Sequence, residues 1–508
     1  MQLKVALQRL IILIVISTVS FVFVAQRQTG AVNSALSISI PKVWDDAEIA
    51  TVELPLADAM ATPKHITAEY YYRIPVRPIY KSYPVYALGR EPLDYQEWLN
   101  RQEPQAVFDP SQLKTEEDWT QAGEIVFDAP IFYDAVVKPA HIKDPKWYES
   151  NGVPVAKDGT LPYFQYVIRE KGKVEMGTVS CAMCHTRVMP DGKVIKGAQG
   201  NFPFDRAAIF NAAQSLPPER VRLLQRSLFG APWVKPDPHA GLDQVPVAEI
   251  AQWHAAIPPG VLARQGSSVH YPTQVPDLIG VKERKYLDHS GLVRHRSFVD
   301  MMRYAALNQG ADDLASYGGF VPGARDFRTL PDPATRGRYS DEQLYALSLY
   351  LYSLRPPANP NKFDDVAARG ERIFEQQRCG SCHPAPLYTN NRLIPAEGFQ
   401  VPDDHLERYD IFPTVIGTDP YLTLKTRRGT GYYKVPSLKG LWYRGPFEHN
   451  GLVASLEDWF DPRRLSEDYV PTGFRGVGAK TRAVKGHRFG LDLSVENRRA
   501  LIAFLKTL

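Results

Sequence analysis

The chain has 508 residues, of which 44% are hydrophobic and 23% are charged. This composition is that of a globular protein with roughly two to three domains, which excludes a fibrous or disordered chain. The formal net charge of +4 comes from 60 basic and 56 acidic residues scattered along the chain, so no nucleic-acid partner is predicted.

The first 35 residues have the pattern of an export segment. Lys4 and Arg9 precede an uncharged, mostly apolar run at 10–25. That run is short for a membrane-spanning helix, and no clean cleavage site of small residues follows it. Two alternatives stay open for 1–35, a cleaved signal peptide or a membrane anchor formed by 10–25. Both predict a periplasmic or other extracytoplasmic location, with anchoring in the inner membrane in the second case.

Residues 36–110 have no counterpart elsewhere in the chain. They contain frequent prolines and the run Tyr70-Tyr71-Tyr72. We expect an N-terminal extension that wraps around the body of the protein and packs its aromatic rings on it.

The chain has only four cysteines, and they form two Cys-x-x-Cys pairs, each followed directly by histidine, at 181–185 and 379–383. Two cysteines at this spacing can add to the vinyl groups of one haem, and the adjacent histidine becomes its proximal axial ligand. A zinc site would need all four thiolates to converge and would leave both histidines unexplained. The sequence therefore predicts two covalently attached haem c groups, bound by Cys181, Cys184, Cys379 and Cys382 with iron ligands His185 and His383.

Similar blocks occur in the same order around the two motifs, which indicates a diverged duplication. Gly-Glu-x-x-Phe occurs at 123–127 and at 370–374, and 275–293 matches 435–453 at nine of nineteen positions. We expect mainly α structure in two cytochrome c-like domains with long loops, at 111–355 and 363–508.

Several elements can be predicted inside these domains. Each closes on a helix whose N-cap is serine, at 340–354 and 494–508, and Ser340 with Gln343 fits a capping box. Amphipathic helices are expected at 218–229 and 298–308. The segment of about 128–176, inserted before the first motif, is expected to be a proline-rich loop with at most a short strand at 163–168.

The sixth ligand decides whether a haem iron carries electrons or binds a small molecule. His487 lies seven residues before the closing helix, on a loop able to reach the second haem, whereas the equivalent position in the first half is Pro333. This asymmetry favours a six-coordinate second haem with His383 and His487, and an open or weakly occupied first haem. The alternative for His487 is an ordinary surface histidine.

His289 and His449 occupy equivalent positions in the repeated block. A shared hydrogen bond to a haem propionate or a backbone carbonyl is one interpretation. The other is catalytic: His289, next to Asp288, would handle protons beside the open haem during O–O bond cleavage. Met301 and Met302 are more often core residues than ligands, although a weak methionine ligand is an alternative for the first haem.

Three aromatic residues, Trp253, Trp442 and Tyr286, are candidates for a position between the haems, where they would shorten electron tunnelling. Packing alone explains them equally well.

The segments 433–440, 446–451 and 493–508 resemble the bacterial di-haem cytochrome c peroxidase superfamily, which includes the methylamine dehydrogenase maturation enzyme and the rubber oxygenases. The resemblance covers 360–508 and, more loosely, 110–508. At the position of His487 the peroxidases usually carry methionine. The resemblance therefore implies that this chain, with histidine there, is similar to the rubber-oxygenase type. The family's inter-haem tryptophan, expected near 287–291, is absent. The rubber oxygenases are also larger, so their polymer substrate is not carried over.

We therefore expect a redox enzyme that uses O2 or hydrogen peroxide at the first haem and relays electrons through the second. Oxygen attack on an apolar substrate is one form of this activity. Its electron donor would be a redox partner protein or a small molecule. The alternative is a non-catalytic electron-transfer cytochrome in which both irons are six-coordinate.

Overall fold

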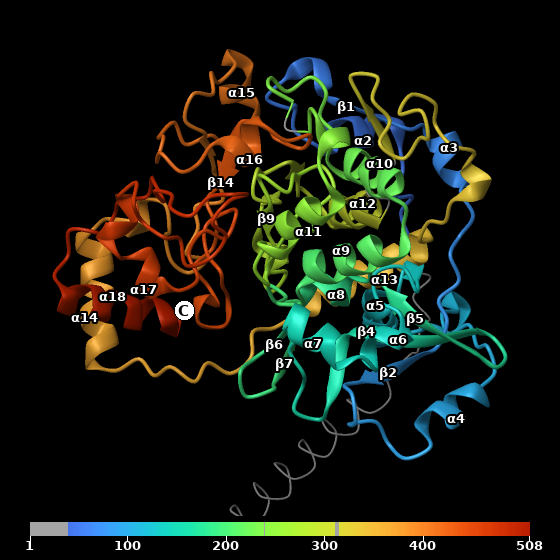
Figure 1. Cartoon of the computed structure of the whole chain (residues 1–508). Helices are drawn as coiled ribbons and strands as arrows, with labels where there is room; N and C mark the ends of the chain where they lie inside the picture. Colours follow the sequence, from blue (N-terminus) through green and yellow to red (C-terminus); the bar gives the residue numbers. More distant parts are fainter. Residues whose placement is uncertain (1–38, 238, 310–313) are drawn as a thin grey trace, which may run out of the picture.

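The computed structural model describes residues 39–237, 239–309 and 314–508, so the predicted export segment lies outside it. Among the described residues no helix is long and apolar enough to cross a membrane. The structure is 37% helical and 13% strand, and helices predominate as expected. Figure 1 shows the second half, in orange and red, as a body beside the green and cyan first half, with α14 and α18 on its outer side.

Helices occur along the whole described chain. The first part of the chain contains α2 Asp46–Val52, α3 Ala68–Arg73, α4 Tyr95–Asn100, α5 Glu116–Asp128, α6 Pro139–Ile142, α7 Pro145–Asn151, α8 Cys181–His185, α9 Phe204–Ser215, α10 Pro218–Phe229, α11 Val247–Ala255, α12 Phe298–Gln309 and α13 Asp341–Ser353. The second half contains α14 Asp365–Gln376, α15 Asp403–Arg408, α16 Tyr421–Leu424, α17 Leu456–Trp459 and α18 Val495–Thr507.

The strands form one four-stranded sheet and several two-stranded ladders, all antiparallel. The sheet has the order β2-β4-β5-β3. The strands are β1 Pro63–His65, β2 Ser82–Tyr86, β3 Phe132–Tyr133, β4 Thr160–Glu170, β5 Lys173–Thr178, β6 Thr186–Val188, β7 Val194–Lys196, β8 Val261–Leu262, β9 Thr273–Gln274, β10 Tyr286–Leu287, β11 Val293–Arg294, β12 Ala315–Tyr317, β13 Leu393–Pro395 and β14 Tyr432–Lys434.

The predicted helices are confirmed to within two residues at each end. Ser340 caps α13 through the expected capping box with Gln343, and Ser494 caps α18 by accepting a hydrogen bond from the backbone of Asn497. α10 and α12 occupy the two amphipathic segments. These elements were predictable because their signals, a cap followed by apolar residues at helical spacing, are local.

The prediction of a loop for 128–176 is wrong. The segment contains α6, α7, β4 and most of β5, and β4 extends well beyond the short strand expected. Two of the prolines that suggested a loop, Pro139 and Pro145, are the first residues of helices, where the missing N–H costs nothing. Gly172, with a φ of +79°, lies in the tight turn between β4 and β5.

A glycine allows close packing of the two helices that frame each motif. On α5 a Cβ at Gly123 would overlap the carbonyl oxygen of Ala346 on α13. On α14 a Cβ at Gly370 would likewise overlap the carbonyl oxygen of Ala500 on α18. The two helix pairs therefore meet in the same way, backbone against backbone.

The N-terminal extension contacts both halves. The ring of Tyr71, from the tyrosine run, is fully buried and stacks on Trp44 with centroids 4.4 Å apart. The backbone N–H of Leu54 donates to Leu292, and that of Ala57 donates to Gly429. In Figure 1 this blue segment runs along the outside of the first half, from α2 and α3 to α4.

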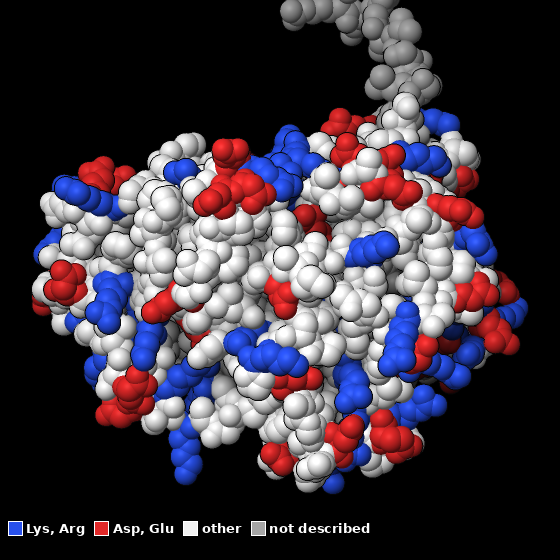
Figure 2. Space-filling model, turned by 90° about the horizontal axis from the view of Figure 1, so that it is seen from above, with Lys and Arg blue, Asp and Glu red and all other residues white. Residues whose placement is uncertain are grey.

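The largest apolar clusters surround the two motifs. One contains Ala182 with Cys181 packed against it, and another contains Phe374 with Cys379 packed against it. The surface face in Figure 2 carries basic and acidic side chains mixed among uncharged ones. The fold thus places both cysteine motifs at apolar cores.

Candidate functional site

The first motif follows the β4–β5 hairpin. Ser180 caps the short helix α8, accepting a hydrogen bond from the backbone of Met183 at 3.1 Å. The Nδ1–H of His185 donates to the carbonyl of Pro276, with Nδ1 and O 3.0 Å apart. This bond fixes the ring and leaves Nε2 as the unprotonated nitrogen, which is the arrangement an iron ligand needs.

The second motif follows α14 directly. His383, which is 8% exposed, donates from Nδ1 to the carbonyl of Tyr388 at 3.1 Å. Burial lowers the pKa of His383, while hydrogen bonds to the backbone of Tyr388 and Pro436 oppose that shift. Pro436 and Pro276 are equivalent in the repeat, so the histidines of both motifs meet equivalent loops.

The four thiols are free and do not form a metal cluster. Among the described residues no group of three or more histidine, cysteine or acidic side chains is placed to hold a metal ion. Burial raises the pKa of Cys181 to about 12 and that of Cys379 to about 11, so both are protonated at neutral pH.

His487 is a partly buried histidine close to His383. Burial lowers its pKa to about 3, and the electrostatic interactions with His383 and Arg464 lower it further. Its Nδ1 is buried without a hydrogen-bond partner. A buried polar atom in this state is costly, and a ligand role or an ordinary surface role for His487 both stay predictions. Its surroundings fit a ligand that approaches the second motif.

Arg464 holds the loop that carries His487. The side chain of Arg464 is fully buried and donates to the backbone carbonyls of Val484, Gly486 and His487. Its Nε donates to the carbonyl of Trp459 at 2.8 Å, and the ring of Trp459 lies 5.2 Å from that of His487. One guanidinium therefore ties the His487 loop to the end of α17 and fixes the direction in which the imidazole points.

Asp288 lies at the centre of a buried ion network next to the first motif. Its Oδ1 is 2.6 Å from Nη1 of Arg264 and accepts a hydrogen bond from the hydroxyl of Tyr304 at 2.7 Å. Its Oδ2 is 3.7 Å from Arg428. Burial favours the protonated acid, but Arg264 and Arg428 together hold the pKa of Asp288 well below its usual range. Asp288 is thus an ionised partner of two arginines, and a catalytic role for it stays a prediction.

His289 is neutral and is held by a backbone carbonyl, which is one of the two interpretations of this position. Its Nε2–H donates to the carbonyl of Gln274 at 3.0 Å. Burial lowers the pKa of His289 to about 3, and Lys434 and His449 lower it further. Proton handling by His289 during O–O cleavage stays a prediction.

The two repeated blocks exchange equivalent hydrogen bonds. The backbone N–H of Gln274 donates to the carbonyl of His449 at 2.8 Å, and that of Lys434 donates to the carbonyl of His289 at 2.9 Å. Since Lys434 and His449 are the equivalents of Gln274 and His289, the contact is reciprocal. The loops that carry Pro276 and Pro436 therefore lie directly against each other.

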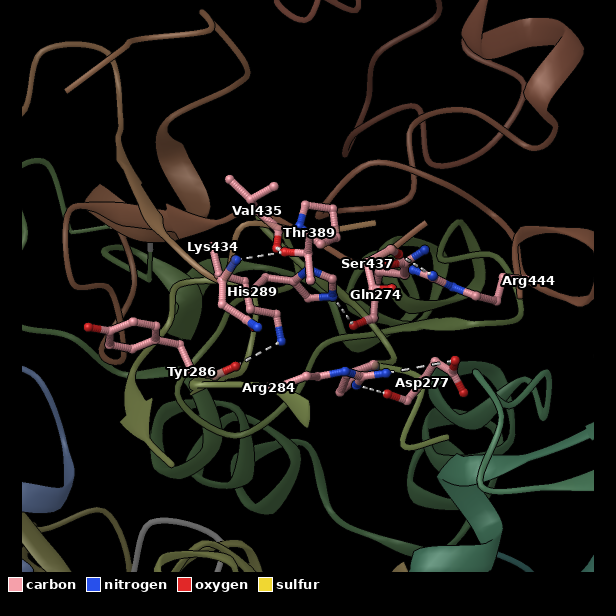
Figure 3. Close-up of a pocket in the computed structure, with 13 residues that line it drawn as sticks. Gln274, Asp277, Arg284, Tyr286, His289, Thr389, Lys434, Val435, Ser437 and Arg444 are labelled. Carbon is pink, nitrogen blue, oxygen red and sulfur yellow. Dashed lines mark hydrogen bonds and ion pairs between the residues drawn. The ribbon is translucent and has the colours of Figure 1, made fainter. Parts of the chain in front are cut away.

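A cationic pocket lies between these two loops (Figure 3). Arg284 donates to the carbonyls of Asp277 and Ile279 in its own loop. Arg444, its equivalent, donates to the carbonyls of Ser437 and Lys439. Lys434 also lines the pocket. Its pKa is lowered to about 7, mainly by burial and next by the charge of Arg284.

The charge of this pocket is unbalanced. Against two arginines and the partly protonated Lys434 stands one carboxylate, that of Asp277, which is 3.9 Å from Arg284 and accepts a hydrogen bond from Tyr443 at 3.1 Å. Buried cations normally have anionic partners. The pocket therefore has the electrostatic character of a site for carboxylate or other anionic groups.

The remaining sequence-predicted residues are dispersed. Met301 and Met302 are fully buried in the apolar cluster that Cys181 packs against. Tyr286 lines the cationic pocket, Trp442 lines a separate surface pocket, and Trp253 packs beside His270 with ring centroids 5.2 Å apart. Of the three aromatic candidates, only Tyr286 thus lines the pocket between the two loops.

Sequence reasoning missed the arginines. Arg284 and Arg444 are identical at equivalent positions of the repeat, and this signal could have identified them. Arg264 and Arg464 carry no such signal, because a buried arginine is recognised only from the carbonyls and carboxylates that surround it in the fold.

No family model and no curated protein matches this chain. Among solved structures, it is similar to hydrazine synthase of Kuenenia stuttgartiensis, with 17% identity over 57% of this chain and 88% of that chain and a TM-score of 0.29. It is also similar to a MauG-like protein associated with microbial copper homeostasis, with 16% identity, the same coverage of both chains and a TM-score of 0.31. TM-scores this low do not establish a common fold.

Proposed function

We propose that this chain is a di-haem c-type cytochrome that acts as a redox enzyme, with one haem c attached at each Cys-x-x-Cys-His motif. The observation that carries this proposal is the state of the two motif histidines. His185 and His383 each donate from Nδ1 to a backbone carbonyl, so each keeps Nε2 available for iron. When bound, haem supplies one-electron redox chemistry and a site for O2 or hydrogen peroxide.

The cationic pocket supports two haems rather than one. It is lined by Pro276 and Pro436, whose backbones meet the proximal histidines of the first and second motif. Haem propionates are carboxylates, and Arg284, Arg444 and Lys434 would offset their charge in a region with little access to water. The same arrangement supports the duplication, with cytochrome c-like domains at 111–355 and 363–508 joined by a linker at 355 to about 362.

The two haems would have different tasks. His487 would close the second iron opposite His383, which suits electron relay, while Pro333 at the equivalent point of the first half offers no ligand. The first haem would therefore take O2 or hydrogen peroxide. Asp288 would act at the first haem through its ion pair with Arg264, which lies close to Cys184 and His185. His289 would support the loop that carries Pro276 through its hydrogen bond to Gln274.

Further parts of the proposal rest on the sequence. The export segment fits an extracytoplasmic protein, the compartment where haem is attached to c-type cytochromes. Its electrons would come from a redox protein or a small donor. Membership of the di-haem cytochrome c peroxidase superfamily, on the oxygenase-like side marked by His487, is proposed on the motifs at 433–451 and 493–508.

Replacing His487 by alanine tests the ligand assignment. We expect one low-spin haem to become high-spin, because its iron loses the sixth ligand, and the new open site to bind cyanide. Electron paramagnetic resonance and visible spectra of the oxidised protein give the readout.

The control is His405→Ala, which removes another buried histidine of the second half, one bonded to Tyr432 at 2.9 Å. It should leave both haem spin states unchanged. A low-spin signal that survives intact in His487→Ala would show that another residue closes the second iron.

A further inference from the structure

We propose that Tyr433, with His449 and Glu448, forms a redox-active tyrosine site between the two haems, an inference that rests on the proposed function. The phenol oxygen of Tyr433 is 3.1 Å from Nε2 of His449, and the two rings stack with centroids 4.2 Å apart. Nδ1 of His449 is 2.6 Å from the carboxylate of Glu448. All three side chains are buried.

The site lies on the connection between the two motifs. Tyr433 is three residues before Pro436, whose backbone meets His383. The carbonyl of His449 accepts a hydrogen bond from Gln274, two residues before Pro276, which holds His185. A side chain oxidised here is therefore reached from both motifs through short runs of covalent and hydrogen bonds.

The arrangement provides for the proton as well as the electron. Loss of one electron makes a phenol strongly acidic, so its proton must move to a base within hydrogen-bond reach. The single phenol proton has two groups within hydrogen-bond reach, the carbonyl of Asp419 at 2.8 Å, to which the hydroxyl donates, and Nε2 of His449 at 3.1 Å. Only Nε2 is a base, because the carboxylate of Glu448 keeps the other ring nitrogen protonated and stabilises the imidazolium that forms.

The step balances with hydrogen peroxide as oxidant. Reduction of hydrogen peroxide to two waters takes two electrons and two protons. Tyr433 would supply one electron and a bound haem would supply the other, while the two protons would come from solvent. The phenol proton stays on His449, which leaves a neutral tyrosyl radical next to an imidazolium–carboxylate pair. The donor would then return two electrons, one to the tyrosyl radical and one to the haem, and the proton on His449 would return to the phenol oxygen.

The first half lacks this arrangement. The position equivalent to Tyr433 is Thr273, and Asp288, equivalent to Glu448, faces Arg264 rather than its neighbouring histidine. Burial raises the pKa of Tyr433 well above its ordinary value, and Glu448 adds to this, so the phenol is protonated before oxidation. The asymmetry fits a function specific to the second half rather than a packing feature common to both.

The test uses the full haem-loaded protein, treated with hydrogen peroxide, freeze-quenched and examined by electron paramagnetic resonance. We expect a tyrosyl radical, identified by the narrowing of its signal in protein made with ring-deuterated tyrosine. Tyr433→Phe should abolish this signal. His449→Phe, which keeps a ring to stack on but removes the base, should slow radical formation by about 100-fold or more.

Tyr432→Phe is the matched control. Tyr432 is adjacent in the same strand, is fully buried and bonds to His405, but it packs in a different apolar cluster. Its replacement should leave the signal unchanged. Glu448→Gln serves as a second variant if Tyr433→Phe does not fold, and it should slow radical formation while keeping the shape of the site.

The number of covalent haems is measured in every sample. Failure of the proposed function can therefore be distinguished from failure of the redox-active tyrosine site. Protein without two covalent haems would contradict the proposed function. Protein with both haems that consumes hydrogen peroxide without forming a tyrosyl radical, or that forms it unchanged in Tyr433→Phe or in Glu448→Gln, would overturn the redox-active site.

Discussion

Gly370→Ala is expected to destabilise the protein by about 3 kcal/mol or more, because the added methyl group cannot be accommodated between α14 and α18. The new Cβ would overlap the carbonyl oxygen of Ala500 and lie 2.7 Å from Cβ of Phe504. In an isolated helix the same change would stabilise by roughly 0.8–1 kcal/mol, so the sign of the effect reports the helix contact. Urea unfolding of the haem-loaded protein measures it.

Arg372→Ala, an exposed change on the same helix, is the control and should leave the unfolding midpoint unchanged. Gly123→Ala should match Gly370→Ala, since its Cβ would overlap the carbonyl oxygen of Ala346 and lie 2.8 Å from Cβ of Tyr350. An unchanged or raised midpoint in either glycine variant would contradict the close contact of that helix pair.

Arg464→Met is expected to destabilise the protein by about 3–5 kcal/mol and to disturb the second haem. The change removes the donors that hold Val484, Gly486 and His487 and leaves their carbonyls buried without partners. Because the His487 loop is then free to move, we expect part of the low-spin signal to become high-spin although His487 is still present. Chemical unfolding and electron paramagnetic resonance measure the two effects separately.

The neighbouring Arg463 provides the control, since its side chain is 84% exposed and, among the residues that the structure describes, forms an ion pair with Asp461 alone. Arg463→Ala should change neither stability nor spin state. A stability loss in Arg464→Met without any change of the haem spectrum would show that the arginine supports the fold but not the position of His487.

Local signals made part of this molecule predictable. Ser340 and Ser494 cap their helices as expected, and the two Cys-x-x-Cys-His motifs each start a short helical turn next to an apolar core. Caps and motifs depend on neighbours a few residues away, so the sequence alone carries them. The same holds for the strand at 163–168, which lies inside β4.

Features that depend on distant contacts were not predictable. The sheet formed by β2, β3, β4 and β5 joins the N-terminal extension to the 128–176 segment, and the prolines there suggested a loop. The network around Asp288 draws Glu53 from the extension and Arg428 from the second half, 3.3 Å apart, to one place. Such pairings require the fold, because no periodicity or spacing marks them.

The repeat was informative in a different way. Comparison of the blocks at 275–293 and 435–453 identified His289 and His449 as equivalent. It did not predict that the two histidines have different hydrogen-bond partners. His289 bonds a backbone carbonyl, whereas His449 lies between Glu448 and Tyr433. One substitution, tyrosine where the first half has threonine, accompanies this change of environment.

The most direct test of the account is the stoichiometry of carbon monoxide binding to the reduced protein, with covalent haem counted in the same sample. We expect two haems per chain and one bound carbon monoxide, at the haem held by Cys181 and Cys184. Two haems that bind no carbon monoxide would instead indicate an electron-transfer cytochrome with both irons closed. Binding at both haems would contradict the role of His487, and a chain without covalent haem would contradict the account as a whole.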